Sequence, residues 1–197
     1  MKKIIVIIAI LIAAINLSAD FIAVNEMPTD LAKKRAIFFN KKMNSIKKLN
    51  EVSQLEEVNK LFNRFIKYNS DLNIYNKRNF IASIEETVLT LTGDCDDYAM
   101  AKFQALRYLG FSSTKMKLIY SVERGVKHIK LIVKVSSKYY VLDSYDKRFR
   151  KLRLKEVRQD LNRFRSASLF EKLVFYKKKS RNFSTLAALS NKINSRG

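Results

Sequence analysis

The stretch Gly93-Asp94-Cys95-Asp96-Asp97-Tyr98-Ala99 surrounds the only cysteine of the chain and decides how the chain is expected to fold. Apolar residues recur after it at helical spacing as far as Leu106, and Gly110 is a typical helix stop. The pattern predicts a helix with Asp94 as its N-cap and Cys95 in its first turn, on the buried side. Because the positive end of a helix favours a thiolate, Cys95 is a candidate nucleophile.

The pattern changes after Gly110 to three short runs rich in β-branched residues, at 116–122, 126–135 and 138–142. Short turns separate the runs, which predicts three consecutive antiparallel strands. His128, the only histidine, lies near the start of the second run, and Asp143 ends the third. If the second strand folds back against the cysteine helix, His128 can act as a base and Asp143 can orient it.

Each of these three residues also has a non-catalytic explanation. A lone cysteine is often a buried packing residue, a histidine on a strand is often a surface residue, and an aspartate at a strand end often forms a turn. Only their joint placement favours catalysis.

Two amphipathic helices are predicted ahead of the motif, over Thr29–Asn50 and Glu51–Tyr68. Residues 70–92 read as a connecting region with a helix over 84–91. The sequence therefore predicts an α+β fold in which N-terminal helices and a cysteine-bearing helix pack on an antiparallel sheet. One domain is expected over residues 20–176, with a partly helical basic region from 152 to 176. Residues 177–197 form a basic polar tail without a core stripe, which is expected to be disordered.

The N-terminus has the pattern of an export signal. Met1-Lys2-Lys3 precedes an apolar run from Ile4 to Ile15, and Ala19 is a suitable cleavage site. Residues 1–19 are therefore predicted to be a signal peptide, the alternative being an uncleaved N-terminal anchor. A single thiol in an exported protein is either buried and inert or kept for its reactivity.

The chain is strongly basic, with 39 Lys and Arg residues against 18 Asp and Glu and a formal charge of +21. Such a surface is weakly attracted to anionic membranes or acidic partners, although a general preference for lysine explains the charge equally well. No nucleic-acid partner is expected, because no binding module is recognisable.

The acids beside the cysteine present a conflict. Asp94, Asp96 and Asp97 can cap the helix and complement its dipole, but carboxylates around a thiol oppose its ionisation. A hard cation would remove this conflict, and clustered aspartates suit calcium. We therefore expect a calcium ion near Asp94 and Asp96, with helix capping as the alternative role.

The heptapeptide at Gly93–Ala99, followed by Leu109-Gly110, resembles the bacterial transglutaminase-like cysteine peptidases of the LapG type. The resemblance runs from about Glu51 to Asp143. It implies a papain- and transglutaminase-like core with Cys95 as nucleophile, His128 as general base and acid, and Asp143 as the orienting carboxylate. It also implies calcium binding by Asp94 and Asp96.

The resemblance carries expectations about biology as well. Its members are periplasmic endopeptidases that cut a large surface adhesin near its N-terminus, release cells from a biofilm and are restrained by an inner-membrane cyclic di-GMP receptor. A monomeric periplasmic protein is expected here. The chain departs from the family pattern in having Asp96 in place of glutamate, Lys130 in place of an apolar residue, Ser144 in place of asparagine, and no tryptophan.

Two other functions remain open from the sequence. The same three residues would suit a transglutaminase-like acyltransferase or amidase acting on cell-wall peptides, since this kind of fold supports several acyl chemistries. The chain could also be an inactive, calcium-dependent binding module.

Overall fold

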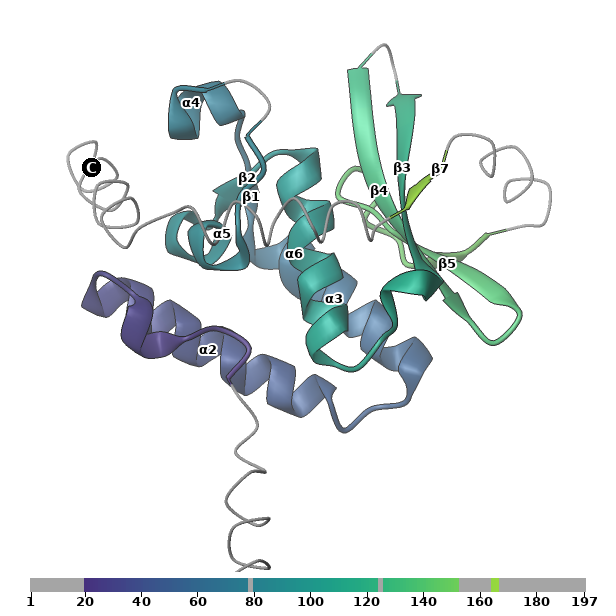
Figure 1. Ribbon diagram of the computed structural model, residues 1–197, viewed down its shortest axis with the longest axis horizontal. Helices are drawn as coiled ribbons and strands as arrows, with labels where there is room; N and C mark the ends of the chain where they lie inside the picture. Colours follow the sequence, from purple (N-terminus) through teal and green to yellow (C-terminus); the bar gives the residue numbers. More distant parts are fainter. Residues whose placement is uncertain (1–19, 78–79, 124–125, 153–163, 167–197) are drawn as a thin grey trace, which may run out of the picture.

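The helices gather on one side of the molecule and an antiparallel sheet lies on the other, with helix α6 between them (Figure 1). The structure is a computed structural model that describes residues 20–77, 80–123, 126–152 and 164–166. The observed arrangement of helices and antiparallel sheet is the predicted α+β fold.

The first half of the chain is helical. A 3₁₀ turn, η1 (Val24–Glu26), precedes α2 (Asp30–Ile46) and α3 (Glu51–Phe65). Thr29 caps α2 by accepting a hydrogen bond from the backbone of Ala32, and Asn50 caps α3 in the same way. Both helices begin within a residue of the predicted positions but end earlier.

Helix α3 ends before its predicted limit because the chain leaves it to form a strand. Strand β1 (Lys67–Tyr68) pairs in parallel with β2 (Thr92–Gly93), which directly precedes the cysteine motif. Two short helices, α4 (Asp71–Tyr75) and α5 (Ile84–Thr90), lie between these strands. The ladder therefore brings the end of α3 next to the start of the motif.

Helix α6 (Cys95–Tyr108) starts and stops where the sequence predicts. Gly110 adopts a φ of 97°, in the left-handed region, and the N–H of Phe111 donates to the carbonyl of Leu106. The Gly110 N–H donates to the carbonyl of Arg107, which completes a Schellman motif. A short 3₁₀ turn, η2 (Ser113–Lys115), then leads into the sheet.

The five-stranded sheet has the order β6-β5-β4-β3-β7, with every neighbouring pair antiparallel. Its three long strands, β3 (Met116–Glu123), β4 (Val126–Val135) and β5 (Lys138–Leu142), confirm the predicted ones. The edges are β6 (Arg150–Lys151) and β7 (Phe164–Ser166). Strand β7 lies inside the region predicted to be partly helical, and it is extended because it pairs with β3. The predicted signal at 1–19 and tail at 177–197 lie outside the described residues.

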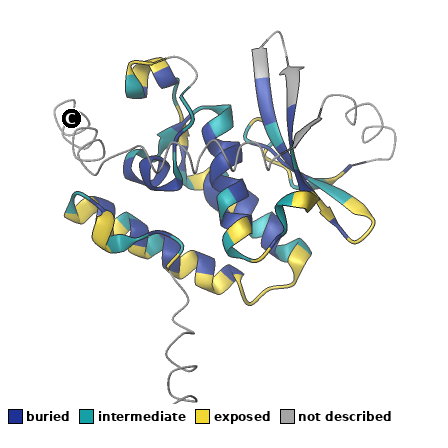
Figure 2. Ribbon diagram, in the orientation of Figure 1, coloured by how far each residue is buried: buried dark blue, intermediate teal, exposed yellow. Residues whose placement is uncertain are grey.

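The main core surrounds α6 and is formed by buried residues of α2, α3, α5, α6 and the sheet. Alternate residues of β4, including Leu131 and Val133, pack toward the helices, while Ile132 joins a small cluster with Ile119 on the other face. Figure 2 shows α5 and the middle of α6 as buried, with exposed residues along the outer side of α2. Within the described residues no helix is long and apolar enough to span a bilayer.

Candidate active site

Cys95 lies at the first position of α6 and lines a cleft of about 460 Å³. His128 of β4 lines the same cleft, together with residues from the end of α3 and from the loop after β5. Helix α6 packs against β4, and the backbone N–H of Ile129 reaches the Cys95 sulfur. The fold thus brings the only thiol and the only imidazole of the chain to one cleft, as the sequence predicted.

The thiol is half-buried, and its surroundings oppose ionisation. Burial, followed by the charge of the nearby Asp94 carboxylate, raises the pKa of Cys95 to about 11. Hydrogen bonds from the backbone N–H groups of Ile129 and Cys95 only partly offset these effects. The conflict expected from the sequence is therefore present in the folded protein.

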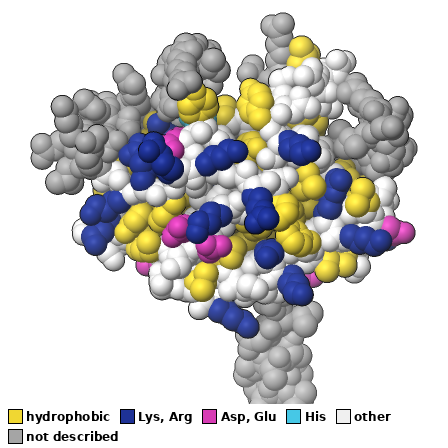
Figure 3. Space-filling model, turned by 180° about the vertical axis from the view of Figure 1, so that it is seen from behind, with side chains coloured by type: hydrophobic (Ala, Val, Ile, Leu, Met, Phe, Trp, Pro, Cys, Tyr) yellow, Lys and Arg dark blue, Asp and Glu magenta, His cyan; other side chains and the backbone are white. Residues whose placement is uncertain are grey.

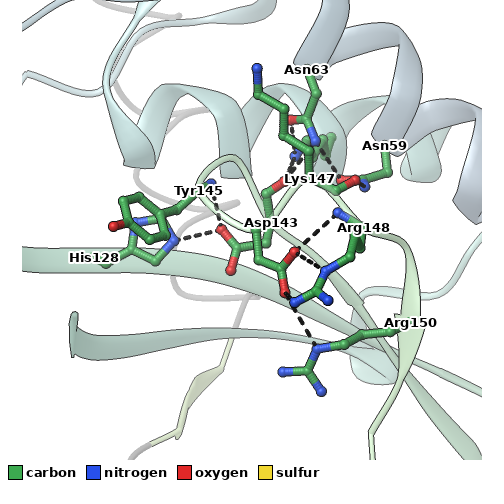
Figure 4. Close-up of polar contacts among 10 residues, drawn as sticks. Asn59, Asn63, His128, Asp143, Tyr145, Lys147, Arg148 and Arg150 are labelled. Carbon is green, nitrogen blue, oxygen red and sulfur yellow. Dashed lines mark hydrogen bonds and ion pairs between the residues drawn. The ribbon is translucent and has the colours of Figure 1, made fainter. Parts of the chain in front are cut away.

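His128 and Asp143 are both buried and form a direct hydrogen bond. The His128 Nε2 atom lies 2.6 Å from Asp143 Oδ1, which also accepts a bond from the Tyr145 backbone at 2.8 Å (Figure 4). Burial disfavours a charged Asp143, but the bonds from His128 and Tyr145 outweigh it and hold the pKa of this carboxyl below its usual range. An ionised Asp143 fixes the ring so that Nδ1 is the nitrogen left for chemistry.

Lys130, which stands in place of an apolar residue of the family pattern, is half-buried and adds to this effect. Its positive charge contributes to the lowered pKa of Asp143. The departure from the family pattern is therefore compatible with an ionised Asp143.

Asp94, Asp96 and a third carboxylate, Asp71, form a cluster that could hold a metal ion. One carboxylate oxygen from each lies within 4.8 Å of the others. The Oδ1 atom of Asp96 is buried and accepts no hydrogen bond from the residues that the structure describes. Burial and the neighbouring Asp94 raise the pKa of Asp96 well above its usual range. A divalent cation would give the Asp96 Oδ1 atom a partner and would stabilise the charged carboxylates. Calcium suits such a site, because it prefers oxygen ligands that carry negative charge.

Asp71 is the site residue that the sequence reasoning did not assign. It is the first residue of α4 and lies 23 positions before Asp94 in the chain, so no local spacing links them. The β1–β2 ladder brings the two segments together, as the Asn69 N–H donates to the Gly93 carbonyl at 3.0 Å. The only available signal was that the family resemblance extends through this position.

Asp97 has a structural role. Its side chain is fully buried, accepting bonds from the backbone of Asp94 at 3.2 Å and of Ala82 at 2.7 Å. Burial raises its pKa to about 8, even though these two bonds favour the charged form. Asp97 closes a capping box with Asp94 and fixes the first turn of α6.

Comparisons with known proteins agree with this geometry. The sequence model of the family described as bacterial transglutaminase-like cysteine proteinase matches residues 32–158. Among curated protein sequences no match was found.

Solved structures of Legionella pneumophila LapG resemble the chain. The calcium-bound form is 26% identical with a TM-score of 0.55, covering 65% of this chain and 71% of that protein. The EGTA-treated form is 26% identical with a TM-score of 0.56, and the match covers 70% of this chain and 78% of that protein. These matches place the chain in the same fold as that protein, and they agree with the arrangement of α6 on an antiparallel sheet.

Gly93 is expected to be essential for the geometry of this site. A Cβ at position 93 would lie 2.6 Å from the Asp97 Cβ and 2.8 Å from its Oδ2, so Gly93→Ala must shift the first turn of α6. We expect a loss of about 1–3 kcal/mol in the free energy of unfolding, as for other overpacked sites, and a clear loss of peptidase activity per folded molecule.

Gly110→Ala is the matched control, because it strains the other end of the same helix without a clash. It should cost about 1–2 kcal/mol and leave activity unchanged. Urea unfolding and an activity assay corrected for folded protein measure both effects. Equal activity in the two variants would contradict the role given to Gly93.

Proposed function

The chain belongs to the bacterial transglutaminase-like cysteine proteinases, and we propose that Cys95, His128 and Asp143 are its catalytic residues. The observation that carries this proposal is the 2.6 Å bond between His128 Nε2 and Asp143 in the cleft that Cys95 lines. A nucleophile, a base and a group that orients the base are the minimum set for thiol acyl chemistry.

The proposed reaction is hydrolysis of an internal peptide bond. His128 takes the thiol proton through Nδ1 while the Cys95 sulfur attacks the peptide carbonyl. As the C–N bond breaks, His128 gives that proton to the leaving amine and a thioester remains on Cys95. His128 then takes a proton from water, which attacks the thioester, and the products are a carboxylic acid and the free thiol.

The oxyanion formed in both steps requires hydrogen-bond donors. The backbone N–H of Cys95 is one of the groups at the start of α6 that have no partner within the helix. It can therefore donate to the developing negative charge. Asp143 takes no part in proton transfer and serves to hold the imidazole.

We propose that calcium is held by Asp71, Asp94 and Asp96. Support comes from their clustered oxygens, from the buried and unbonded Oδ1 of Asp96, and from the calcium-bound and EGTA-treated forms in which Legionella LapG is known. When bound, the ion supplies positive charge beside the nucleophile. The carboxylates then no longer oppose formation of the Cys95 thiolate.

The biological setting is proposed from the family resemblance and the N-terminal sequence. The protein would be exported to the periplasm and act as an endopeptidase on a large surface adhesin. Cleavage near the adhesin's N-terminus would release cells from a biofilm, under the control of an inner-membrane cyclic di-GMP receptor. Figure 3 shows lysines and arginines spread across one face of the molecule, which suits a general attraction to anionic surfaces.

Removing a catalytic residue should abolish cleavage. Cys95→Ala and His128→Ala should each lower kcat/KM at least about 10³-fold on an adhesin fragment, because the two groups act as one unit. The assay is gel and mass analysis of the cleaved fragment, with an added primary amine to detect acyl transfer. Only hydrolysed product is expected.

Asp143→Ala should also be severely impaired, and Asp146→Ala is its matched control. Asp146 is three residues away, carries the same charge and bonds to the exposed Arg148 instead of to the histidine. It should retain activity within about twofold. Undiminished cleavage by Cys95→Ala would overturn the assignment, and an amine-linked product would favour the acyltransferase alternative.

Calcium should stabilise the protein as well as activate it. At a calcium concentration about 100 times Kd, ligand binding adds about 2.7 kcal/mol, or roughly 5–10 °C in Tm for a chain of this size. EGTA should reverse both the stabilisation and the activity. Thermal unfolding and calorimetric titration with calcium measure the effect without substrate.

Asp71→Asn and Asp94→Asn should remove the response to calcium, since each takes away one carboxylate of the cluster. Asp30→Asn is the control, because its side chain is 93% exposed at the start of α2 and lies outside the cluster. If wild-type Tm and activity are the same in calcium and in EGTA, the acids serve only as helix caps.

A further inference from the structure

Lys102 is fully buried in the centre of α6, with 0% of its surface exposed. Lysine is almost never buried to this extent unless its ammonium is paired, because desolvating the charge is costly. Burial lowers the pKa of Lys102 to about 7, although the charge of Asp143 opposes this effect. Lys102 therefore calls for an explanation beyond helix packing.

The Lys102 ammonium makes two hydrogen bonds and one cation–π contact. Its Nζ atom donates to Asn63 Oδ1 at 2.7 Å and to the backbone carbonyl of Asp143 at 2.9 Å. It also lies 5.7 Å from the centre of the Tyr98 ring. Two N–H donors of the ammonium thus have oxygen acceptors, and the ring adds a cation–π contact.

The carbonyl of Asp143 receives a second bond, from Asn63 Nδ2 at 2.7 Å. Two side chains from two different helices, α3 and α6, thus hold the backbone of one residue. Asn59, one turn earlier on α3, donates to the carbonyl of Lys147 at 3.3 Å. The loop from 143 to 147 is therefore fixed near both of its ends (Figure 4).

The position of Lys102 connects the parts of the active site. It lies on the helix that carries Cys95, two turns further along, and its ammonium reaches the strand end that carries Asp143. Asp143 in turn holds His128. We propose that Lys102 and Asn63 are positioning residues that set Asp143, and through it His128, at the correct distance from Cys95. This inference rests on the proposed function of the three catalytic residues.

A purely stabilising role is a weaker explanation of the network. Replacing buried charged groups by apolar ones of similar volume is often neutral or stabilising, so stability alone gives no reason to bury an ammonium. Hydrogen bonds to the backbone carbonyl of Asp143 do, however, fix the position of this residue. The carboxylate of Asp143 must face the imidazole of His128.

Kinetics of two variants test the proposal. Lys102→Met keeps the length of the side chain but removes its donors, and Asn63→Asp keeps an acceptor for Lys102 but removes the donor to Asp143. Each should lower kcat about 10- to 100-fold, because the geometry of the base changes. KM should stay within about twofold in Lys102→Met, whose side chain is fully buried, whereas Asn63 lines the cleft and its variant is judged by kcat. Met100→Ala is the control: Met100 is also fully buried in α6 but its side chain carries no N–H or O–H donor, and the variant should lower stability without lowering kcat.

A spectroscopic measurement tests the same proposal without substrate. His128 is the only histidine, so in untagged protein the imidazole N–H signals belong to it without further assignment. The Nε2–H proton shared with Asp143 should give a downfield signal in wild type and in Met100→Ala. It should move upfield or broaden in Lys102→Met and Asn63→Asp.

The outcomes separate the two proposals. Unchanged kcat and an unchanged Nε2–H signal in both folded variants would overturn the positioning role, even if Cys95→Ala is inactive. Should Lys102→Met fail to fold, Asn63→Asp gives the result alone. An active Cys95→Ala would instead overturn the proposed function, and the Nε2–H signal would still show whether Lys102 and Asn63 position Asp143.

Discussion

The first turn of α6 places a half-buried thiol among aspartates, and the arrangement of the site follows from that crowding. Asp97 is fully buried and holds the turn in place by accepting two backbone hydrogen bonds. Gly93 has no Cβ and so leaves space for the Asp97 side chain. Asp94 and Asp96 remain beside the sulfur and disfavour its ionisation, together with burial. A cation bound there would offset the negative charge of these acids, and Asp71 is close enough to offer it a third carboxylate oxygen.

Helix α6 serves as the common support of the site. Its first residue is the proposed nucleophile, Tyr98 donates to the Ile66 carbonyl at the end of α3, and Lys102 reaches the backbone of Asp143. Its buried side packs on β4, the strand that carries His128. The distances between the three proposed catalytic groups therefore depend on one rigid element and on the polar contacts it makes with α3 and the loop after β5.

Much of this arrangement is predictable from local sequence. The bounds of α6 follow from the Asp94 cap, the apolar spacing and Gly110, and the three long strands follow from their β-branched runs. Other features depend on contacts between distant segments and leave no local signal. The two-residue strands β1 and β2 are too short for a periodic pattern, and Asp71 joins the acid cluster only because they pair. Lys102 is 41 residues from Asp143, so no local pattern indicates that the two are in contact.

The reactivity of the single thiol tests the account most directly. Because Cys95 is the only cysteine, the mass added by iodoacetamide at neutral pH reports its alkylation alone. Calcium-loaded wild type should react faster than EGTA-treated wild type, which lacks the compensating cation. It should also react faster than calcium-loaded His128→Ala, which lacks the base. Equal alkylation rates in all three samples would contradict the claim that calcium and His128 together activate Cys95.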